Sequence, residues 1–326
     1  MEISDIKAFL QPQMQEMETY IRASLSSDIV LLNQFNTACR EHPGKMMRPA
    51  LSLLVAGAIG QVNDDTLHYA AATELMHNAT LMHDDVVDGA TERRGLPSVY
   101  KLLGAGPAVL VGDYWLVKCI NRVLSAPNVT FRVVRLYADT LSHLAEGELL
   151  QMEKASSGDT TEEDYLRILY GKTAALFELA AVSAAFSVNA PEEVISAMGS
   201  FARELGYAFQ IKDDIFDYSE PSEALGKPVG IDLKEQKITQ PLLCALDRLP
   251  AEEASLVRKK VTEASDHPEY VLEIQEIVRR ERGVEAAIGK MEEHLAMALA
   301  ALDILPASVE KDYLAALARY VVDRTT

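Results

Sequence analysis

Two copies of one aspartate pattern are the residues of this chain whose types and spacing most clearly predict chemistry. The first copy, Asp-Asp-Val-Val-Asp, spans residues 84–88, and the second, Asp-Asp-Ile-Phe-Asp, spans residues 213–217. Each follows an apolar stretch that is compatible with a helix, where positions i, i+3 and i+4 share a face. Each copy would therefore gather its carboxylates on one stripe, and two such helices packed together would line one cavity from both sides.

Carboxylates in apolar surroundings are costly unless a cation compensates them. Mg²⁺ prefers a few carboxylates together with water and substrate phosphate oxygens. The pattern therefore predicts a helical protein that holds a diphosphate through two to three Mg²⁺ ions. Asp64-Asp65, which lacks a third aspartate, instead indicates an ordinary loop or helix start. The predicted metal ligands are Asp84, Asp85, Asp88, Asp213, Asp214 and Asp217.

Several basic and polar residues lie close in sequence to these acids or to helix starts. Lys45 and Arg48 begin an apolar stretch, and a helix N-terminus favours anions. Arg93 and Arg94 follow the first motif, and guanidinium groups bind phosphate in a bidentate manner. Further candidates are His77, which precedes the first motif on the same helix face, and Lys172, Thr173, Gln210, Lys227 and Lys237.

The composition excludes some partners. The formal net charge of −18 argues against nucleic acid, because phosphate contacts need Lys and Arg. Cys39, Cys119 and Cys244 are widely spaced, show no metal-ligand pattern and are expected to be buried or half-buried thiols of a cytoplasmic protein. We expect no signal peptide and no transmembrane segment, since no uncharged apolar run approaches the length that a bilayer requires.

Apolar residues recur at helical spacing almost throughout, and the low aromatic share of 6% also favours an all-α fold. No linker divides the chain, so we expect a single domain over residues 1–326. The spacing predicts helices over residues 48–60, 65–88, 107–124 and 131–152 and in most of the chain after residue 239. It predicts loops at 89–95 and 156–159. Helix starts are expected at a capping box of Thr160 with Glu163, at Lys172 and at Pro191, which would lie inside the first turn. The stretch over 219–239 is too broken for a helix and is a candidate lid.

Taken together, these residues resemble the trans-type polyprenyl diphosphate synthases, most closely the long-chain, octaprenyl-type bacterial members. The resemblance covers nearly the whole chain and is strongest over residues 40–240. It rests on the two aspartate motifs and on the following segments: Arg93-Arg94-Gly95, Gly112-Asp113, Glu146-Gly147-Glu148, Gly171-Lys172-Thr173 and Asp232-Leu-Lys234-Glu235-Gln-Lys237.

The resemblance implies a helical bundle of the isoprenoid synthase type around a central cavity, and a homodimer. It also implies condensation of isopentenyl diphosphate with an allylic diphosphate, farnesyl or geranylgeranyl, to a longer all-trans product. The allylic C–O bond would ionise, and the isopentenyl double bond would attack the resulting cation. The leaving diphosphate would then take the proton, so no protein base is needed. The allylic diphosphate would be bound through the metal ligands and by Arg93, Lys172, Thr173, Lys227 and Lys237. Lys45, Arg48, His77 and Arg94 would bind isopentenyl diphosphate, and Gln210 is a further substrate-binding candidate.

Two segments depart from the family pattern. The family usually has Gly-Gly-Lys-Arg-x-Arg-Pro where this chain has Pro-Gly-Lys-Met-Met-Arg-Pro over residues 43–49, so affinity at the isopentenyl site is in question. The family often has Gly-Asp-Asp where this chain has Gly230-Ile-Asp232. Neither departure touches the predicted metal ligands.

Product length would depend on the depth of the pocket beneath the first motif. Short-chain members carry a bulky aromatic at one of the positions that Ala79 and Thr80 occupy here, so we expect the pocket to be open at this level. Tyr137 and Trp115 are candidates for its floor, although core packing is the commoner role of a buried aromatic residue. We expect a product of about seven or eight isoprene units, set by the depth of the pocket.

Other functions remain open at this point. A geranylgeranyl diphosphate synthase would make a shorter product, and a terpene cyclase shares the first motif but normally lacks the second. A metal phosphohydrolase using His83-Asp84 leaves the second motif unexplained. A di-iron bundle needs two Glu-x-x-His motifs, whereas only Glu74 to His77 fits. The regulatory subunit of a two-component prenyl synthase usually loses aspartates that this chain keeps.

Overall fold

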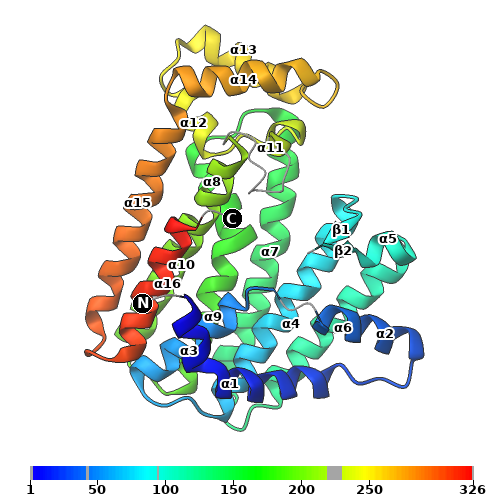
Figure 1. The fold of residues 1–326 in the computed structure, drawn as a ribbon, viewed down its shortest axis with the longest axis vertical. Coiled ribbons are helices and arrows are strands. Elements are labelled where there is room, and N and C mark those ends of the chain that lie inside the picture. The colour runs from blue at the N-terminus through cyan, green and yellow to red at the C-terminus, as the bar shows by residue number, and fades with distance from the viewer. Residues whose placement is uncertain (1–2, 42–43, 94, 219–229, 325–326) are drawn as a thin grey trace. The chain divides into compact units, whose positions relative to one another are not determined.

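The computed structural model describes residues 3–41, 44–93, 95–218 and 230–324, and almost all of its regular structure is helical (Figure 1). This confirms the all-α prediction. Arg94, Lys227 and most of the lid-like stretch lie outside the described residues, and so does the side chain of Cys39.

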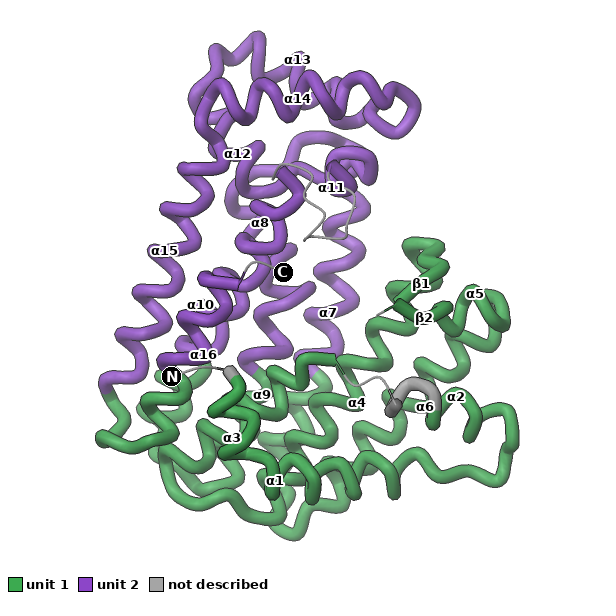
Figure 2. The backbone as a smooth tube through the Cα atoms, in the orientation of Figure 1, with its two compact units in different colours: residues 1–138, 179–199, 304–314 green, residues 139–178, 200–303, 315–326 purple. Residues whose placement is uncertain are grey.

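The chain forms two compact units, which Figure 2 colours separately. Unit 1 comprises residues 1–138, 179–199 and 304–314, and unit 2 comprises residues 139–178, 200–303 and 315–326. The single domain over 1–326 stays a prediction.

Unit 1 holds the first aspartate motif. Its elements are α1 (Ile3–Ser24), α2 (Val30–Glu41), α3 (Met47–Ile59), α4 (Asp64–Val87), β1 (Glu92–Arg93), β2 (Leu96–Pro97), α5 (Val99–Leu103) and α6 (Ala105–Leu124). Helix α4 begins at a capping box, in which the Asn63 side chain accepts a hydrogen bond from the Thr66 amide at 3.0 Å. It is buried along most of its length and lies beside α3 and α6 (Figure 1).

Unit 2 holds the second motif. Its own elements are α8 (Glu162–Leu169), the π-helical turn η1 (Tyr170–Ala174), α11 (Ile231–Lys234), α12 (Gln240–Leu246), α13 (Ala251–Thr262), α14 (Pro268–Arg280) and α15 (Gly283–Ala301), with the 3₁₀ turn η2 (Leu302–Ile304) at its boundary. Helices α7 (Phe131–Ser157), α9 (Ala175–Ser187), α10 (Glu192–Asp217) and α16 (Val309–Asp323) have residues in both units.

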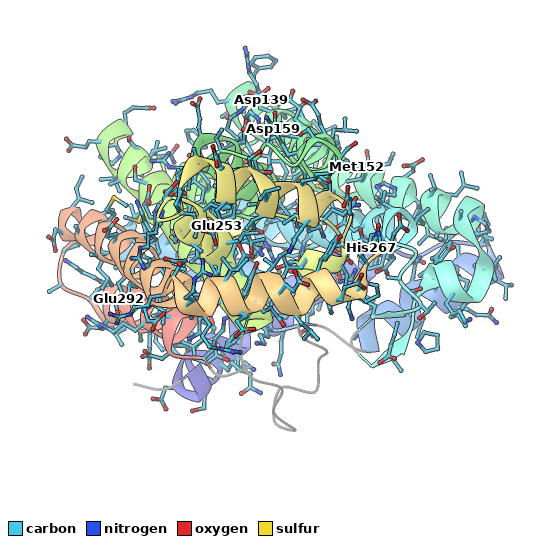
Figure 3. All side chains as sticks on the ribbon, turned by 90° about the horizontal axis from the view of Figure 1, so that it is seen from above. Asp139, Met152, Asp159, Glu253, His267 and Glu292 are labelled. Carbon is cyan, nitrogen blue, oxygen red and sulfur yellow. The ribbon has the colours of Figure 1, made fainter. Side chains whose placement is uncertain are left out.

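The core of unit 2 fixes the helix that carries the second motif. Ile211 and Ile215 of α10 pack in one apolar cluster with Leu242 of α12 and Ile274 of α14. At the edge of this cluster α13 and α14 lie side by side. An ion pair of 2.7 Å joins Arg280 of α14 to Glu253 of α13, and Glu253 is labelled in Figure 3. The apolar stripe of α10 is therefore buried in this core, and the second motif lies at the C-terminal end of the helix with Asp214 buried as well.

Some sequence-based boundaries were wrong. The capping box lies one residue later than predicted, at Thr161 with Asp164, because the Thr161 amide and hydroxyl both reach the Asp164 carboxylate. Lys172 does not begin a helix but lies in the π-turn between α8 and α9. The predicted loop at 89–95 contains strand β1, which pairs antiparallel with β2. Helix α7 extends to Ser157, into the loop expected at 156–159, and α10 begins at Glu192, after Pro191 rather than around it.

One helical stretch of the described chain, Glu162–Ser187, is long and apolar enough to cross a membrane by length and composition. Of its apolar window, 83% is buried inside the protein, which is typical of a core helix.

Candidate active site

The first aspartate motif closes α4 in unit 1 and is joined there by an arginine from the β-hairpin. Asp85 is buried, Asp84 is half-buried and Asp88 is exposed at the C-cap. The Arg93 Nε donates a hydrogen bond of 2.9 Å to Oδ1 of Asp85. The chain leaves α4 through Gly89, whose φ of 62° suits glycine, and the Ala90 amide donates to the Asp85 carbonyl over 2.9 Å, so β1 begins close to the motif. A guanidinium therefore lies against the first motif, whereas contact of Arg93 with a bound phosphate stays a prediction.

The other predicted basic groups of unit 1 lie on α3 and α4. Lys45 is exposed just before α3, and Arg48 is half-buried in the first turn of α3. His77 is half-buried on α4, ahead of the motif on the same helix. Arg94 lies outside the described residues. The binding role of Lys45, Arg48 and His77 stays a prediction.

The residues expected to set product length are also in unit 1. Ala79 is fully buried on α4 and Thr80 is half-buried. Tyr137 is fully buried, and its hydroxyl donates to the Tyr69 carbonyl over 2.7 Å. Trp115 donates from Nε1 to Oδ1 of Asn36 over 2.8 Å. Both aromatic side chains thus have their polar atoms satisfied inside the core, which fixes their orientation.

The second motif ends α10 in unit 2, and each of its three aspartates has a different partner. Asp213 accepts a 2.7 Å hydrogen bond from Nη2 of Arg324. Asp214 accepts one of 2.6 Å from the Tyr165 hydroxyl at Oδ2 and one of 3.1 Å from Gln210 Nε2 at Oδ1. Asp217 accepts from the backbone amides of Ile231 and Asp232, both at 3.0 Å, and so caps α11.

The π-turn η1 presents Lys172 to α7. A Cβ added to Gly171 would lie 2.5 Å from the His143 carbonyl oxygen, and one added to Gly147 would lie 2.7 Å from the Cα of Gly171. Only glycine at both positions allows the two backbones to approach so closely. The approach brings Lys172 Nζ to 3.0 Å from Oε1 of Glu148, so the charged residues that follow the two glycines form an ion pair.

A cavity of about 60 Å³ in unit 2 is bordered by charged side chains of both signs. Its lining includes Lys154, Lys172, Gln210, Asp214, Asp232 and Lys237. Lys154 pairs with Asp164 at 3.0 Å and with Asp159, labelled in Figure 3, at 3.2 Å. Lys237 pairs with Glu235.

Burial dominates the electrostatics of the acids around this cavity. It raises the pKa of Asp214 to about 6, against the lowering effect of the hydrogen bonds from Tyr165 and Gln210. Burial, reinforced by the charges of Asp214 and Asp217, raises the pKa of Asp232 well above its ordinary range. Burial also raises the pKa of Asp217, against its backbone hydrogen bonds. The cavity therefore has carboxylates whose charge is only partly compensated, which is a setting that favours an added cation.

Comparison with known proteins places these motifs in a family. The model of the polyprenyl synthetase family matches residues 30–278. The chain is 35% identical over 324 residues to octaprenyl diphosphate synthase of Haemophilus influenzae, covering 99% of this chain and 98% of that protein. The chain belongs to the polyprenyl synthetase family.

Solved structures agree with this assignment. A decaprenyl diphosphate synthase from Rhodobacter capsulatus superposes with a TM-score of 0.92 at 32% identity, covering 99% of both chains. A polyprenyl synthase from Caulobacter crescentus, solved with calcium and isoprenyl diphosphate, superposes with a TM-score of 0.90 at 29% identity, covering 100% of this chain and 98% of that one. The chain is thus a chain-elongating prenyltransferase with the isoprenoid synthase fold, and these relatives do not favour the cyclase or phosphohydrolase alternatives.

A metal ion fits the residues that this polyprenyl synthetase offers. Among the described residues no three His, Cys, Asp or Glu side chains are already gathered as a metal-binding cluster. The second motif nevertheless supplies carboxylates whose charge burial leaves only partly compensated, and Mg²⁺ commonly completes its shell with water and phosphate oxygens rather than with protein ligands alone. A divalent ion would therefore bind together with a diphosphate.

Sequence reasoning missed three residues of this polyprenyl synthetase that the structure places at the second motif or its cavity: Tyr165, Arg324 and Lys154. Tyr165 carries a weak signal, since it lies two helical turns before Lys172 on an otherwise apolar helix face. Arg324 and Lys154 carry none, because only the tertiary packing decides what they contact.

Proposed function

We propose that this enzyme condenses isopentenyl diphosphate with an allylic diphosphate, farnesyl or geranylgeranyl, to a longer all-trans polyprenyl diphosphate. The observation that carries the proposal is the unit 2 cavity, where Lys172 and Lys237 line the same space as the buried Asp214 and the half-buried Asp232. Lysines bind phosphate as point charges, and carboxylates beside them provide for a cation. The names of the relatives, octaprenyl and decaprenyl diphosphate synthase, support the choice of reaction.

Two to three Mg²⁺ ions would be held by the aspartates of the two motifs. In the second motif 37% of the Asp213 side chain is exposed, whereas Asp214 is buried and Asp217 caps α11. In the first motif Asp84 and Asp88 are more accessible than Asp85, which Arg93 already contacts. When bound, the ions would stabilise the charge that develops on the departing diphosphate.

The chain's own cations would orient the allylic diphosphate. Lys172 is aimed by the π-turn and steadied by Glu148 at 3.0 Å, and Lys237 borders the same cavity. Arg93 and Lys227 would share the remaining charge on this diphosphate. Fixed cations favour departure of the diphosphate because they need no reorganisation as its charge grows. The proton released at the end would go to the diphosphate, so the proposal requires no protein base.

The second substrate would bind apart from the metals. Lys45, Arg48, His77 and Arg94 would hold isopentenyl diphosphate through charge and hydrogen bonds alone. Small side chains at Ala79 and Thr80 support a product of about seven or eight isoprene units, since pocket depth limits what can be enclosed.

A homodimer is the proposed assembly, in the cytoplasm. Leu110, Val117 and Leu124 recur at heptad spacing along α6, and between 53% and 69% of each residue is exposed. Residues spaced in this way form one helix stripe, and an apolar stripe of this kind suits contact with a second copy of the chain.

The test is incorporation of radiolabelled isopentenyl diphosphate with farnesyl diphosphate and Mg²⁺, with and without chelator, followed by separation of products by chain length. Magnesium-dependent products of about 35–40 carbons would support the proposal, whose pocket is open at Ala79. Products that stop at about 20 carbons would keep the reaction and move the floor of the pocket upward, with Trp115 the first residue to replace. No incorporation by the folded protein with any allylic primer would overturn it.

A further inference from the structure

The hydroxyl of Tyr165 is the first member of a chain of hydrogen bonds within unit 2. Tyr165 on α8 donates to Oδ2 of Asp214 over 2.6 Å. The other oxygen of Asp214 accepts from Gln210 Nε2 over 3.1 Å. The Gln210 Oε1 in turn accepts from the Thr173 hydroxyl over 2.8 Å. The chain of contacts therefore runs from α8 through α10 to the π-turn.

The chemistry of these groups fixes the direction of every bond. An ionised carboxylate only accepts, so both Tyr165 and Gln210 must donate to Asp214. Gln210 then turns its amide nitrogen to Asp214 and its oxygen to Thr173, whose hydroxyl must donate. Each group has one arrangement that satisfies all of its partners, and a network of this kind fixes side chains firmly when it is buried.

Three of these side chains are buried, so water has little access to their hydrogen bonds. Tyr165 is 2% exposed, Asp214 is 4% exposed and Thr173 is 5% exposed. Both oxygens of Asp214 are engaged by the protein, and the two ends of the Gln210 amide are engaged as well. Gln210, predicted from the sequence to bind substrate, is thus placed to connect two other residues.

The π-turn is the part of the chain that needs such support. A π-helical turn is locally less regular than an α-helix and is common at functional sites. On the side of α7, the close approach of Gly147 to Gly171 fixes the η1 backbone. On the side of α10, Thr173 is held through Gln210, and the neighbouring Lys172 points to the cavity.

We infer that Tyr165 is a positioning residue for the allylic diphosphate, acting through Asp214, Gln210 and Thr173 to hold the turn that carries Lys172. The inference rests on the proposed function, in which Lys172 and Thr173 serve that diphosphate. Tyr165 also borders the cavity, and the inference assigns its effect to Asp214 rather than to direct contact with substrate. Removing its hydroxyl releases one oxygen of Asp214, and the loosened Asp214 then holds Gln210 and Thr173 less firmly.

The experiment is a double-mutant cycle of Tyr165→Phe and Thr173→Val, each of which removes one hydroxyl and keeps the shape of the side chain. Steady-state kinetics would give KM for the allylic diphosphate, KM for isopentenyl diphosphate and kcat. Isothermal titration with inorganic diphosphate and Mg²⁺ would give affinity without turnover. Tyr20→Phe is the matched control, because it also removes a hydroxyl that donates to a carboxylate, that of Asp64, away from both motifs.

We expect Tyr165→Phe to raise KM for the allylic diphosphate and to weaken the binding of inorganic diphosphate. Each effect should be about tenfold, the scale of a lost supporting hydrogen bond at a functional site. KM for isopentenyl diphosphate should stay unchanged and kcat should fall less. The double variant should be no worse than Thr173→Val alone, since both changes break one pathway. Tyr20→Phe should match the parent enzyme.

Other outcomes overturn the inference. Additive effects in the cycle would mean that Tyr165 does not act through Thr173. A fall in kcat with both KM values unchanged would mean that Tyr165→Phe merely lowers the fraction of folded enzyme. A Thr173→Val variant with parental affinity for diphosphate would remove the endpoint of the pathway. If the parent enzyme itself neither binds diphosphate nor turns over, the proposed function fails and the inference fails with it.

Discussion

Arg324 donates a hydrogen bond of 2.7 Å from Nη2 to Oδ1 of Asp213, although the two residues are 111 positions apart in the sequence. The guanidinium also donates to the Phe209 carbonyl over 3.0 Å and lies 4.2 Å from the centre of the Phe209 ring. Only 5% of the Arg324 side chain is exposed, against 37% for Asp213. The end of α16 is thereby tied to the first carboxylate of the second motif, which is a proposed metal ligand.

Replacing Arg324 should therefore disturb metal-dependent turnover. Arg324→Met removes the partner that orients Asp213, and we expect about a tenfold loss in the apparent affinity for Mg²⁺. Arg324→Lys should keep only part of the parental affinity for Mg²⁺, because an ammonium lacks the planar fork that reaches both Asp213 and the Phe209 carbonyl. The measurement is initial rate against Mg²⁺ concentration. Arg319→Met, an exposed change on the same helix, is the control and should leave the Mg²⁺ curve in place. Equal curves for Arg324→Met and the parent would contradict the assignment.

Asp85 should be essential to the first motif. Asp85→Asn removes a buried charge that Arg93 contacts at 2.9 Å, so the guanidinium loses its partner and the motif loses one anion. We expect turnover to fall about a hundredfold, as when one fixed electrostatic contact is removed from a reacting site. Asp64→Asn changes an exposed acid at the other end of α4 and should keep more than half of the rate. Comparable losses in the two variants would show that the effect comes from the helix and not from the motif.

The sequence was sufficient for the helices and for the identity of the motifs. Apolar periodicity placed α3, α4 and α6 to within about two residues, because their buried stripes are long. Recurrence of the aspartate pattern picked out Asp84 and Asp213 while setting aside Asp64. Burial of Cys119 and Cys244 was also predicted correctly.

What the sequence could not supply depends on tertiary contact. The capping box at Thr161 competes with one at Thr160, and local spacing alone allows both. The π-turn at Lys172 is set by the close approach of Gly147 to Gly171, which joins segments far apart in the chain. Arg324 follows Asp323 at the end of α16, and nothing in the local sequence suggests that its partner is Asp213. Such residues can be assigned only once the packing of the helices is known.

Gly171 should not tolerate a side chain. In Gly171→Ala the new Cβ would lie 2.5 Å from the His143 carbonyl oxygen, which is backbone and cannot rotate away. We expect a loss of about 2 kcal/mol in the free energy of unfolding, typical of overpacking, together with a higher KM for the allylic diphosphate as Lys172 shifts. Urea denaturation measures the first effect. Gly289→Ala on α15 meets nothing within 4 Å and should stabilise the protein slightly, so destabilisation by both variants would contradict the packing argument.

A large side chain at Ala79 should shorten the product. Ala79 is fully buried on α4 and Thr80 beside it is half-buried, so Ala79→Phe would fill the proposed pocket but also strain the core. Thr80→Phe gives a second variant at a roomier position. Both should shift radiolabelled products from about 35–40 carbons toward about 20, as chromatography of the dephosphorylated alcohols would show, because the pocket encloses less. Unchanged chain length in both folded variants would remove α4 from the set of length-determining elements.

The apolar stripe on α6 should hold the proposed homodimer together. Leu110 is 69% exposed and Val117 is 58% exposed, so the double change Leu110→Glu with Val117→Glu costs the monomer little while placing charges on the interface. We expect sedimentation velocity to show a dimer for the parent protein and a monomer for the variant. Leu256→Glu on α13, a residue that is 63% exposed, is the matched control and should remain dimeric. A stripe variant that sediments as the parent dimer does would place the interface elsewhere, and dissociation by the control would indicate a general effect of added charge.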